Sequence, residues 1–374
     1  MKKTILPGKT LGILGGGQLG RMLCLEARRM GYRTLVWSGT RVAEPVMGVA
    51  DEVILKEFDD GQALTDFCSA VDVATVEFEN IPLPLLRQVE GKVGLYPSAE
   101  AIGICQNRER EKTFLRDNDI ACTPFRLVHN ADELAEGLRE LGQCVLKTAE
   151  FGYDGKGQVK LAADADAAAA WAEFDAPKGV LEQWVEFERE VSVMVARDGE
   201  GQVVTYDVAE NEHRQHVLDV SIAPARVSEN VAAEAREIAV SVAEKMDYCG
   251  LMGVEFFVKK DGSLLVNEMA PRPHNSGHHT MDACATSQFE QQLRAVCGLR
   301  LGETKLLSPV VMLNLLGDLW RANRLEDELA KEADAYWHFY GKSSREGLRK
   351  CGHANFLGED ALARVQELKE RLLA

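Results

Sequence analysis

The chain has 374 residues, of which 46% are hydrophobic and 27% are charged, as expected for a protein with large folded cores. Its net charge of −16 argues against a nucleic-acid partner, so any bound anion would need a local basic cluster and a metal. No run approaches the ~18 apolar residues of a membrane span. The nine scattered cysteines lack a C-x-x-C pair, which argues against a disulfide framework and predicts a cytoplasmic protein with reduced thiols.

Strands and helices alternate over the first hundred residues. We expect strands at 10–16, 34–37, 51–55 and 72–78, and a helix over 18–30. The first of these strands begins within an N-terminus that lacks the features of a signal peptide. Alternation with short links predicts a doubly wound parallel sheet. Further helices are expected after Ser98, a favourable N-cap residue, and near Asn107.

The pattern changes beyond Cys144. Strands are expected at 145–148, 158–162, 179–185, 190–196 and 309–317, and helices at 162–172, 229–247 and 282–300. The helix at 162–172 is rich in alanine and includes Asp164 near its start. The sequence contains no internal repeat and no low-complexity linker, which favours a compact enzyme with several lobes.

A glycine motif follows the first expected strand. Residues 15–20 read GGGQLG, a match to G-x-G-x-x-G before a helix, where backbone N–H groups can bind a phosphate. An NAD site would have an acidic residue about 20 positions later. Ser38, Thr40 and Arg41 occupy that region and could bind a 2′-phosphate, so an NADP-dependent oxidoreductase is one alternative.

Two glutamates form the strongest signal in the sequence. The segment MGVEFFVKKDGSLLVNEM (252–269) contains two apolar runs around Asp261-Gly262, a favoured two-residue hairpin turn. That turn places Glu255 opposite Glu268 on neighbouring strands, where like charges repel. A divalent cation would offset the repulsion, and ligands that are all oxygens favour Mg²⁺ or Mn²⁺. The simpler alternative is two solvent-exposed glutamates at a sheet edge.

Lys147 precedes a loop that contains Gly152, Gly155 and Gly157. Such a loop can fold over phosphates, with Lys147 beneath them and Lys156 on the loop. The simpler interpretation is a hairpin with exposed lysines. Residues 182–193 are expected to form an edge that binds adenine through backbone hydrogen bonds, with Glu190 accepting ribose hydroxyls.

Basic and histidine residues follow the second glutamate. Arg272 lies between two prolines, and its planar guanidinium suits a carboxylate, bicarbonate or phosphate. His274, His278 and His279 follow, but the glutamate pair makes a zinc site the less favoured interpretation. Lys342, Arg349 and Lys350 form a second basic patch near the C-terminus, which could equally be solvated surface.

These motifs resemble the ATP-grasp superfamily and, within it, the N5-carboxyaminoimidazole ribonucleotide synthetases of purine biosynthesis. The resemblance rests on motifs across almost the whole chain: 12–22, 77–82, 151–158, 182–193, 267–284, 286–299 and 340–353. It implies an α/β ATP-grasp fold with an α+β lid and a Rossmann-like N-terminal domain. The chain departs from the family's pattern at Ser38-Gly39-Thr40, at Ala270 and at Gly347-Leu348.

The resemblance also implies roles for individual residues. The ATP contacts would be Arg108, Lys147, Gly152, Tyr153, Asp154, Gly155, Lys156, Gly157, Gln158, Glu182, Gln183, Trp184, Val185, Glu190, His213, Asn267 and Glu268. The contacts with bicarbonate and the ribonucleotide would be Gln18, Glu77, Asn80, Tyr153, Asp154, Arg272, His274, Lys342 and Arg349. Glu255 and Glu268 would bind the metal, and Arg272, Asp154 and Lys147 would act in catalysis.

The expected domains are an N-terminal substrate domain (1–106), an ATP-grasp domain (107–300, with a lid at about 120–184) and a C-terminal subdomain (301–374). The expected activity is ATP- and Mg²⁺-dependent carboxylation of 5-aminoimidazole ribonucleotide with bicarbonate through carboxyphosphate. Another ATP-grasp carboxylase or amine ligase, and a non-catalytic nucleotide sensor, are the further alternatives. The resemblance also implies a homodimer with small-molecule substrates.

Overall fold

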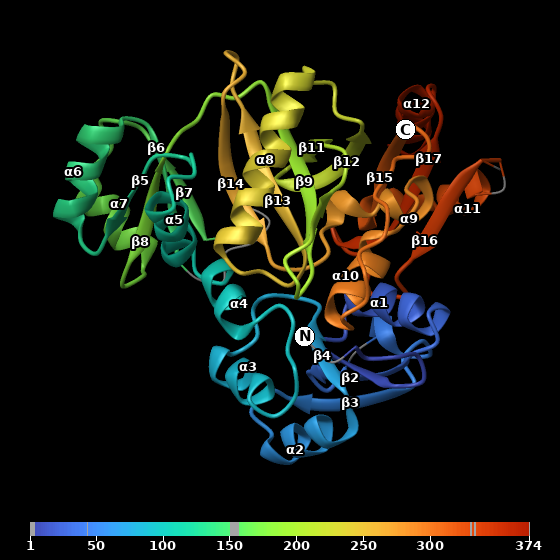
Figure 1. The fold of residues 1–374 in the computed structure, drawn as a ribbon. Coiled ribbons are helices and arrows are strands. Elements are labelled where there is room, and N and C mark those ends of the chain that lie inside the picture. The colour runs from blue at the N-terminus through green and yellow to red at the C-terminus, as the bar shows by residue number, and fades with distance from the viewer. Residues whose placement is uncertain (1–3, 43, 150–156, 330, 333, 374) are drawn as a thin grey trace.

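The strands assemble into three sheets: one in the N-terminal part of the chain, one in a small lid formed by β5 to β8, and one at the centre of the molecule (Figure 1). The computed structural model describes residues 4–42, 44–149, 157–329, 331–332 and 334–373. Within these residues, no helix is long and apolar enough to cross a membrane. None of the nine cysteines, all of which are described, forms a disulfide.

The N-terminal sheet is parallel, with strand order β3-β2-β1-β4. Its elements are β1 (Thr10–Leu14), α1 (Gln18–Arg29), β2 (Arg33–Gly39), η1 (Glu44–Val46), β3 (Glu52–Glu57), α2 (Gly61–Ala70), β4 (Val73–Val76), α3 (Leu83–Glu90) and α4 (Ala99–Cys105). Strand β1 lies inside the sheet and β4 lies at its edge, and both are entirely buried. Leu95 forms a further parallel bridge with Ala74 of β4. The predicted strand–helix alternation is therefore confirmed here.

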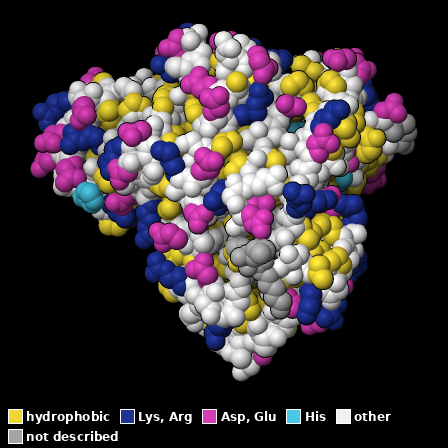
Figure 2. All heavy atoms as spheres, viewed as in Figure 1, with side chains coloured by type: hydrophobic (Ala, Val, Ile, Leu, Met, Phe, Trp, Pro, Cys, Tyr) yellow, Lys and Arg dark blue, Asp and Glu magenta, His cyan; other side chains and the backbone are white. Residues whose placement is uncertain are grey.

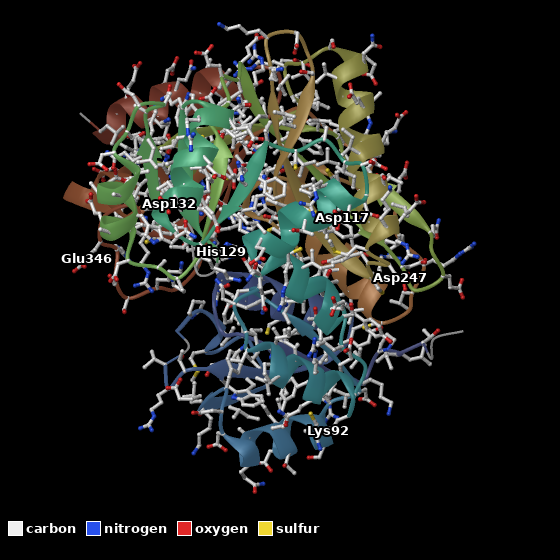
Figure 3. The ribbon with its side chains drawn as sticks, turned by 90° about the vertical axis from the view of Figure 1, so that its left-hand side faces the viewer. Lys92, Asp117, His129, Asp132, Asp247 and Glu346 are labelled. Carbon is white, nitrogen blue, oxygen red and sulfur yellow. The ribbon has the colours of Figure 1, made fainter. Side chains whose placement is uncertain are left out.

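The lid is a four-stranded antiparallel sheet in the order β5-β8-β6-β7. It comprises β5 (Phe125–Val128), α6 (Ala131–Leu141), β6 (Cys144–Thr148), β7 (Gln158–Leu161), α7 (Ala167–Phe174) and β8 (Gly179–Gln183), and it is reached through α5 (Arg108–Asp117). Figure 3 faces this arm, with His129 and Asp132 labelled on it and Lys92 at the far end of the N-terminal sheet.

The central sheet is antiparallel and runs β14-β13-β9-β11-β12-β15-β17-β16, with β10 paired to β9. Its first part contains β9 (Arg189–Arg197), β10 (Val203–Thr205), β11 (Ala209–Arg214), β12 (Val217–Ala223), α8 (Glu229–Lys245), β13 (Gly250–Val258) and β14 (Leu264–Ala270). Helix α8 packs on this sheet through a small-residue face that includes Ala235, Ala239 and Ala243.

The same sheet continues into the C-terminal part of the chain. The remaining elements are η2 (Asn275–Gly277), α9 (Thr280–Ala283), α10 (Gln288–Val296), β15 (Val310–Leu316), η3 (Gly317–Asn323), α11 (Arg324–Leu329), β16 (Ala335–Phe339), β17 (Lys350–Leu357) and α12 (Ala361–Leu373). Because β12 pairs with β15, the C-terminal strands extend the central sheet without a break.

Two of the expected helices are wrong in their extent. The alanine-rich helix begins at Ala167, because the Asp166 carboxylate caps it by accepting from the amides of Ala168 and Ala169, whereas Ala165 lies in a preceding turn. The helix expected over 282–300 divides into α9 and α10, because Ser287 is an N-cap that accepts from the Glu290 amide. The N-cap expected at Ser98 is confirmed, and the helix expected near Asn107 begins at Arg108, with Asn107 as its N-cap.

Candidate active site

A cleft of about 2030 Å³ lies where the three sheets meet, and its walls come from all of them. It contains every described residue to which the sequence assigned a site role: Gln18, Glu77, Asn80, Arg108, Lys147, Gly157, Gln158, Glu182, Gln183, Trp184, Val185, Glu190, His213, Glu255, Asn267, Glu268, Arg272, His274, Lys342 and Arg349. Gly152, Tyr153, Asp154, Gly155 and Lys156 lie outside the described residues.

Three cations surround one buried carboxylate at the cleft; Lys147, Arg108 and Glu182 line it, whereas Lys112 is fully buried and does not. The Nζ of Lys147 lies 2.9 Å and the Nζ of Lys112 lies 3.7 Å from Oε2 of Glu182. Arg108 Nη1 lies 3.5 Å from Oε1 of the same residue. Burial alone would raise the pKa of Glu182, but Lys112, Lys147 and Arg108 outweigh it and lower that pKa to about 2. The cluster keeps a positive excess, which suits a phosphate.

Glu255 and Glu268 are paired across the β13–β14 hairpin, as the sequence predicted. The turn itself is one residue longer than predicted: the Lys259 amide donates to the Ser263 carbonyl at 2.9 Å, which leaves 260–262 as the loop. Gly262 has φ +83°, the left-handed conformation that glycine favours. A β-bulge then compensates for the longer loop, since Phe256 pairs with Val266 but Glu255 pairs with Glu268.

The extra residue of that bulge is Asn267. Its carbonyl accepts a hydrogen bond from the fully buried Lys112 at 3.1 Å, and the amide of Met269, two residues further on, donates to Glu111 at 2.6 Å. Helix α5 therefore fixes the bulge from outside the hairpin. Burial, reinforced by the charge of Glu268, raises the pKa of Glu255 to about 7, so the pair stores a repulsion that a cation would relieve.

The glycine motif at the start of α1 is occupied by a side chain of the protein. Glu77 accepts hydrogen bonds from the amides of Gly17 at 2.5 Å and Gly20 at 2.6 Å. A Cβ at Gly15 would lie 2.2 Å from Glu77 Cγ, and one at Gly17 would lie 2.4 Å from Oε1. These glycines let Glu77 approach the helix N-terminus, which accounts for the motif without a dinucleotide phosphate.

Lys342 faces Glu77 and Gln18 from the loop between β16 and β17. Its Nζ donates to Gln18 Oε1 at 2.6 Å and to the Lys350 carbonyl at 2.7 Å. Burial, together with the nearby Arg349, lowers the pKa of Lys342 to about 8. This contact joins the C-terminal part of the chain to the N-terminal sheet at the cleft.

Arg272 and His274 lie beside the glutamate pair. The carboxylate of Glu79 binds Arg272 through Nε at 2.5 Å and Nη2 at 3.0 Å. His274 Nε2 lies 3.4 Å from Glu255 Oε1, while Nδ1 lies 2.8 Å from the Ser276 hydroxyl. Burial and the charge of Arg272 hold the pKa of His274 well below its ordinary value, so this imidazole is neutral near pH 7.

The pKa of His213 is shifted in the opposite direction to that of His274. His213 Nδ1 lies 2.5 Å from Oε2 of Glu190. Burial lowers the pKa of His213, but the charges of Glu190 and Glu255 outweigh it and raise that pKa above its ordinary value. The raised pKa favours the protonated form of His213 near the glutamate pair.

The other histidines of the 274–279 segment are structural. His278 and His353 are fully buried, with ring centroids 4.8 Å apart, and His353 Nδ1 lies 2.7 Å from the Tyr340 hydroxyl. His278 Nδ1 accepts from Gln288, and His279 Nδ1 lies 2.8 Å from the Ser276 carbonyl. Within the described ranges, no group of three or more His, Cys, Asp or Glu side chains is placed to hold a metal ion.

Several residues of the cleft were not predicted from the sequence. They are Glu79, which binds Arg272, the turn Gln215–His216 between β11 and β12, and the wall residues Glu210, Phe187 and Phe257. Buried Lys112 and Glu111, which fix the bulge, were missed as well. Strand alternation could not have indicated Glu79, because β4 ends at Val76 and both Glu77 and Glu79 follow it.

Comparisons with known proteins agree along the chain. Residues 8–106 match the ribonucleotide synthetase preATP-grasp domain, residues 113–289 the ATP-grasp domain, and residues 310–367 the phosphoribosylaminoimidazole carboxylase C-terminal domain. The chain is 41% identical over 371 residues to the N5-carboxyaminoimidazole ribonucleotide synthase of Bacillus subtilis, which covers 99% of this chain and 97% of that protein.

Two solved structures show the same architecture. An ADP complex of an N5-carboxyaminoimidazole ribonucleotide synthetase is similar with a TM-score of 0.94 and 42% identity, covering 100% of this chain and 98% of that one. The synthase of Aspergillus clavatus in complex with ADP and 5-aminoimidazole ribonucleotide is similar with a TM-score of 0.88 and 29% identity, covering 97% and 98%.

Proposed function

Because the chain belongs to the N5-carboxyaminoimidazole ribonucleotide synthase family, we propose that its cleft joins bicarbonate to the exocyclic amine of 5-aminoimidazole ribonucleotide. The protein is an ATP-grasp ligase, and its reaction is the ATP-dependent carboxylation step of purine biosynthesis. The observation that carries the proposal is the arrangement of one cleft: Lys147 and Arg108 lie on the lid side, paired carboxylates at the centre, and a second basic group in the β16–β17 loop, which faces the N-terminal part of the chain.

ATP is proposed to bind between the lid and the central sheet. Lys147 and Arg108 would neutralise phosphate oxygens, together with the loop that ends at Gly157 and Gln158. The amides of Gln183 and Trp184 already donate to the carbonyls of Pro124 and Gln143, so contacts of these two residues with the base would use their carbonyls. Phe187 and Phe257 stack with centroids 4.6 Å apart and supply an apolar wall beside this edge.

The glutamate pair fits a magnesium ion. Glu255 and Glu268 provide two carboxylates on one wall, and Mg²⁺ is ordinarily held by one or two carboxylates with phosphates and water. The raised pKa of Glu255 supports the fit, because the pair is short of positive charge. When bound, the ion would supply charge neutralisation at the phosphates. Mn²⁺ would satisfy the same oxygen ligands.

The second half of the cleft is proposed to hold bicarbonate and the ribonucleotide. Arg272 would bind the bicarbonate, with neutral His274 beside it. Gln18, Glu77 and Asn80 would contact the ribonucleotide from the N-terminal sheet. Lys342 and Arg349 would contact its anionic groups from the C-terminal side.

The chemistry proceeds in two transfers. A bicarbonate oxygen attacks the γ-phosphorus of ATP, the bond to the β–γ bridging oxygen breaks, and ADP leaves with that electron pair. The amine then forms the N–C bond with the carbon of carboxyphosphate, directly or after release of CO₂, and phosphate departs. The amine proton goes to the departing phosphate or to Asp154. Lys147 and Arg272 contribute by positioning and charge, and a closed lid would exclude water from carboxyphosphate.

Further features of the protein follow from family likeness. We propose a homodimer in the cytoplasm. We also propose a division into the domains 1–106, 107–300 and 301–374, the last of which packs on the core; the pairing of β15 with β12 supports that packing.

Figure 2 shows acidic and basic side chains interspersed on the face it presents.

The test is ADP release by the purified protein with Mg-ATP and bicarbonate, with and without the ribonucleotide. Strong stimulation by the ribonucleotide is expected, with one carboxylated product for each ADP. ADP release that ignores the ribonucleotide would direct the search to another amine acceptor within the ATP-grasp ligases. No ADP release under any condition would reject the proposal and favour a nucleotide sensor.

A further inference from the structure

Glu79 makes a contact that the proposed chemistry does not by itself require. It lies in the segment after β4, and its carboxylate accepts hydrogen bonds from Arg272 Nε at 2.5 Å and Nη2 at 3.0 Å. The two side chains are 20% and 18% exposed, so this ion pair is mostly shielded from water. It joins residues 193 positions apart, one beside the N-terminal sheet and one after strand β14.

Hydrogen bonds restrain the backbone of both partners. Gln106 Nε2 donates to the carbonyls of Glu79 at 2.5 Å and Ile81 at 2.6 Å, which fixes the backbone of the acidic segment. Arg272 is flanked by prolines, and its amide donates to the Ala270 carbonyl at 2.8 Å. These contacts restrain the backbone on both sides of the ion pair, so the pair is a fixed feature of the cleft.

The geometry of the pair divides the guanidinium into two parts. A guanidinium has five N–H groups in a planar fork. Glu79 uses the edge formed by Nε and Nη2, and Nη1 makes only a 3.3 Å contact with the Pro273 carbonyl. One hydrogen of Nη2 and one of Nη1 then form an end-on fork, and Arg272 lines the cleft. A planar oxyanion can accept both hydrogens of such a fork.

We propose that Glu79 is a positioning residue, which holds one edge of Arg272 so that the end-on fork faces the bicarbonate that supplies the carboxyl group to the amine. This inference rests on the proposed function, in which Arg272 binds bicarbonate. Since Glu79 lies two residues after Glu77, in the segment that would contact the ribonucleotide, the ion pair also aligns the anion with the amine that must attack it.

Glu79→Gln tests this role. The amide keeps one acceptor but presents an N–H to a guanidinium N–H, so the edge is no longer held. We expect the KM for bicarbonate to rise about tenfold with the KM for ATP within about twofold. We also expect ADP to form in excess of carboxylated product, because a misplaced carboxyphosphate is hydrolysed before the amine attacks it. Glu79→Asp keeps the charge and should recover part of both losses.

Glu332→Gln is the matched control. Glu332 is 18% exposed and accepts from Arg371 Nη2 at 2.8 Å, which is a similar ion pair outside the residues that line the cleft. It should leave both the bicarbonate KM and the product-to-ADP ratio unchanged. Thermal unfolding of each variant shows whether it folds, and Glu79→Asp carries the test if Glu79→Gln does not.

The outcomes separate this inference from the proposed function. If the wild-type protein shows no ribonucleotide-stimulated ADP release, both are overturned. If the wild type shows it, and folded Glu79→Gln keeps the wild-type bicarbonate KM and a one-to-one ratio, only the positioning role is overturned. Equal rises in the KM for ATP, bicarbonate and the ribonucleotide would also overturn it, because they would indicate general damage to the cleft.

Discussion

Glu255 and Glu268 lie directly opposite each other on neighbouring antiparallel strands, and a bulge at Asn267 produces that pairing. With the three-residue turn alone, Glu255 would have faced Asn267. Because Lys112 and Glu111 bind the bulged backbone, helix α5 determines where the second carboxylate lies. The pair is thus set by a helix that contributes no carboxylate to it.

Replacement of either member of this pair should weaken magnesium binding and lower the activity. For Glu268→Gln and Glu255→Gln we expect ADP release to fall about 100-fold, because one anionic ligand is lost. The Mg²⁺ concentration that gives half-maximal activity should rise in whatever activity remains. The measurement is ADP release against Mg²⁺ concentration. Asp261→Asn, at the exposed tip of the same hairpin, is the control and should behave as wild type; unchanged Mg²⁺ dependence in both site variants would contradict the metal assignment.

Lys342 should make binding of the ribonucleotide depend on pH. Its pKa is lowered to about 8, so the side chain is cationic below pH 8 and loses its charge as the pH rises through that value. The KM for the anionic ribonucleotide should therefore increase above pH 8. In the complex, the bound anion favours the protonated form of the Lys342 side chain. Steady-state kinetics from pH 6.5 to 9.5 would show the step. Lys342→Arg, which stays charged throughout, should abolish the step, and a step that persists in this variant would assign it to another group.

Loss of Glu182 should destabilise the fold as well as the nucleotide site. Glu182 is buried beside Lys147, Lys112 and Arg108, and its removal leaves like charges together without their partner. We expect Glu182→Gln to lower the free energy of unfolding by about 3 kcal/mol or more, as measured by urea denaturation. Addition of Lys112→Met should restore part of that loss, because one buried cation is removed. Simple additivity of the two changes would show that the charges do not interact.

Added side-chain volume in the glycine motif should perturb the protein, whereas a dinucleotide should not bind there. Gly17→Ala places a Cβ 2.4 Å from Glu77 Oε1, so we expect lower thermal stability and a higher KM for the ribonucleotide. Gly61→Ala is the control, because nothing lies within 4 Å of the added carbon. NADPH fluorescence should be unaffected by the wild-type protein. A fluorescence change that Gly17→Ala removes would instead indicate a dinucleotide site.

Local sequence patterns predicted the parts of the site that depend on neighbours in the chain. Two apolar runs around the Asp261-Gly262 dipeptide identified the hairpin. The cross-strand pairing of Glu255 with Glu268 is confirmed, even though the predicted turn was one residue too short. The longer loop and the bulge shift the register in opposite directions, which is why the pairing survives. No local pattern contains the bulge, because α5 contributes to it from 155 residues away.

Contacts distant in the sequence explain the remaining differences. The pairing of Glu79 with Arg272, and of Lys342 with Gln18, depends on how separate lobes meet, which residue spacing does not encode. Ser287 looks like an interior residue of one long helix over 282–300, but it instead caps α10. The glycine motif was typical of a phosphate site because a carboxylate and a phosphate satisfy the same amides at a helix N-terminus.

Because β12 pairs with β15, the C-terminal part of the chain shares a continuous sheet with the central part and is not an independently folding domain. A fragment that stops near residue 300 would leave the buried strand β12 as a bare sheet edge, ready to pair with another copy. Such a truncation should therefore yield aggregates instead of a working ATPase. For the same reason, gene fusions at this protein's C-terminus are better placed after α12 than before β15.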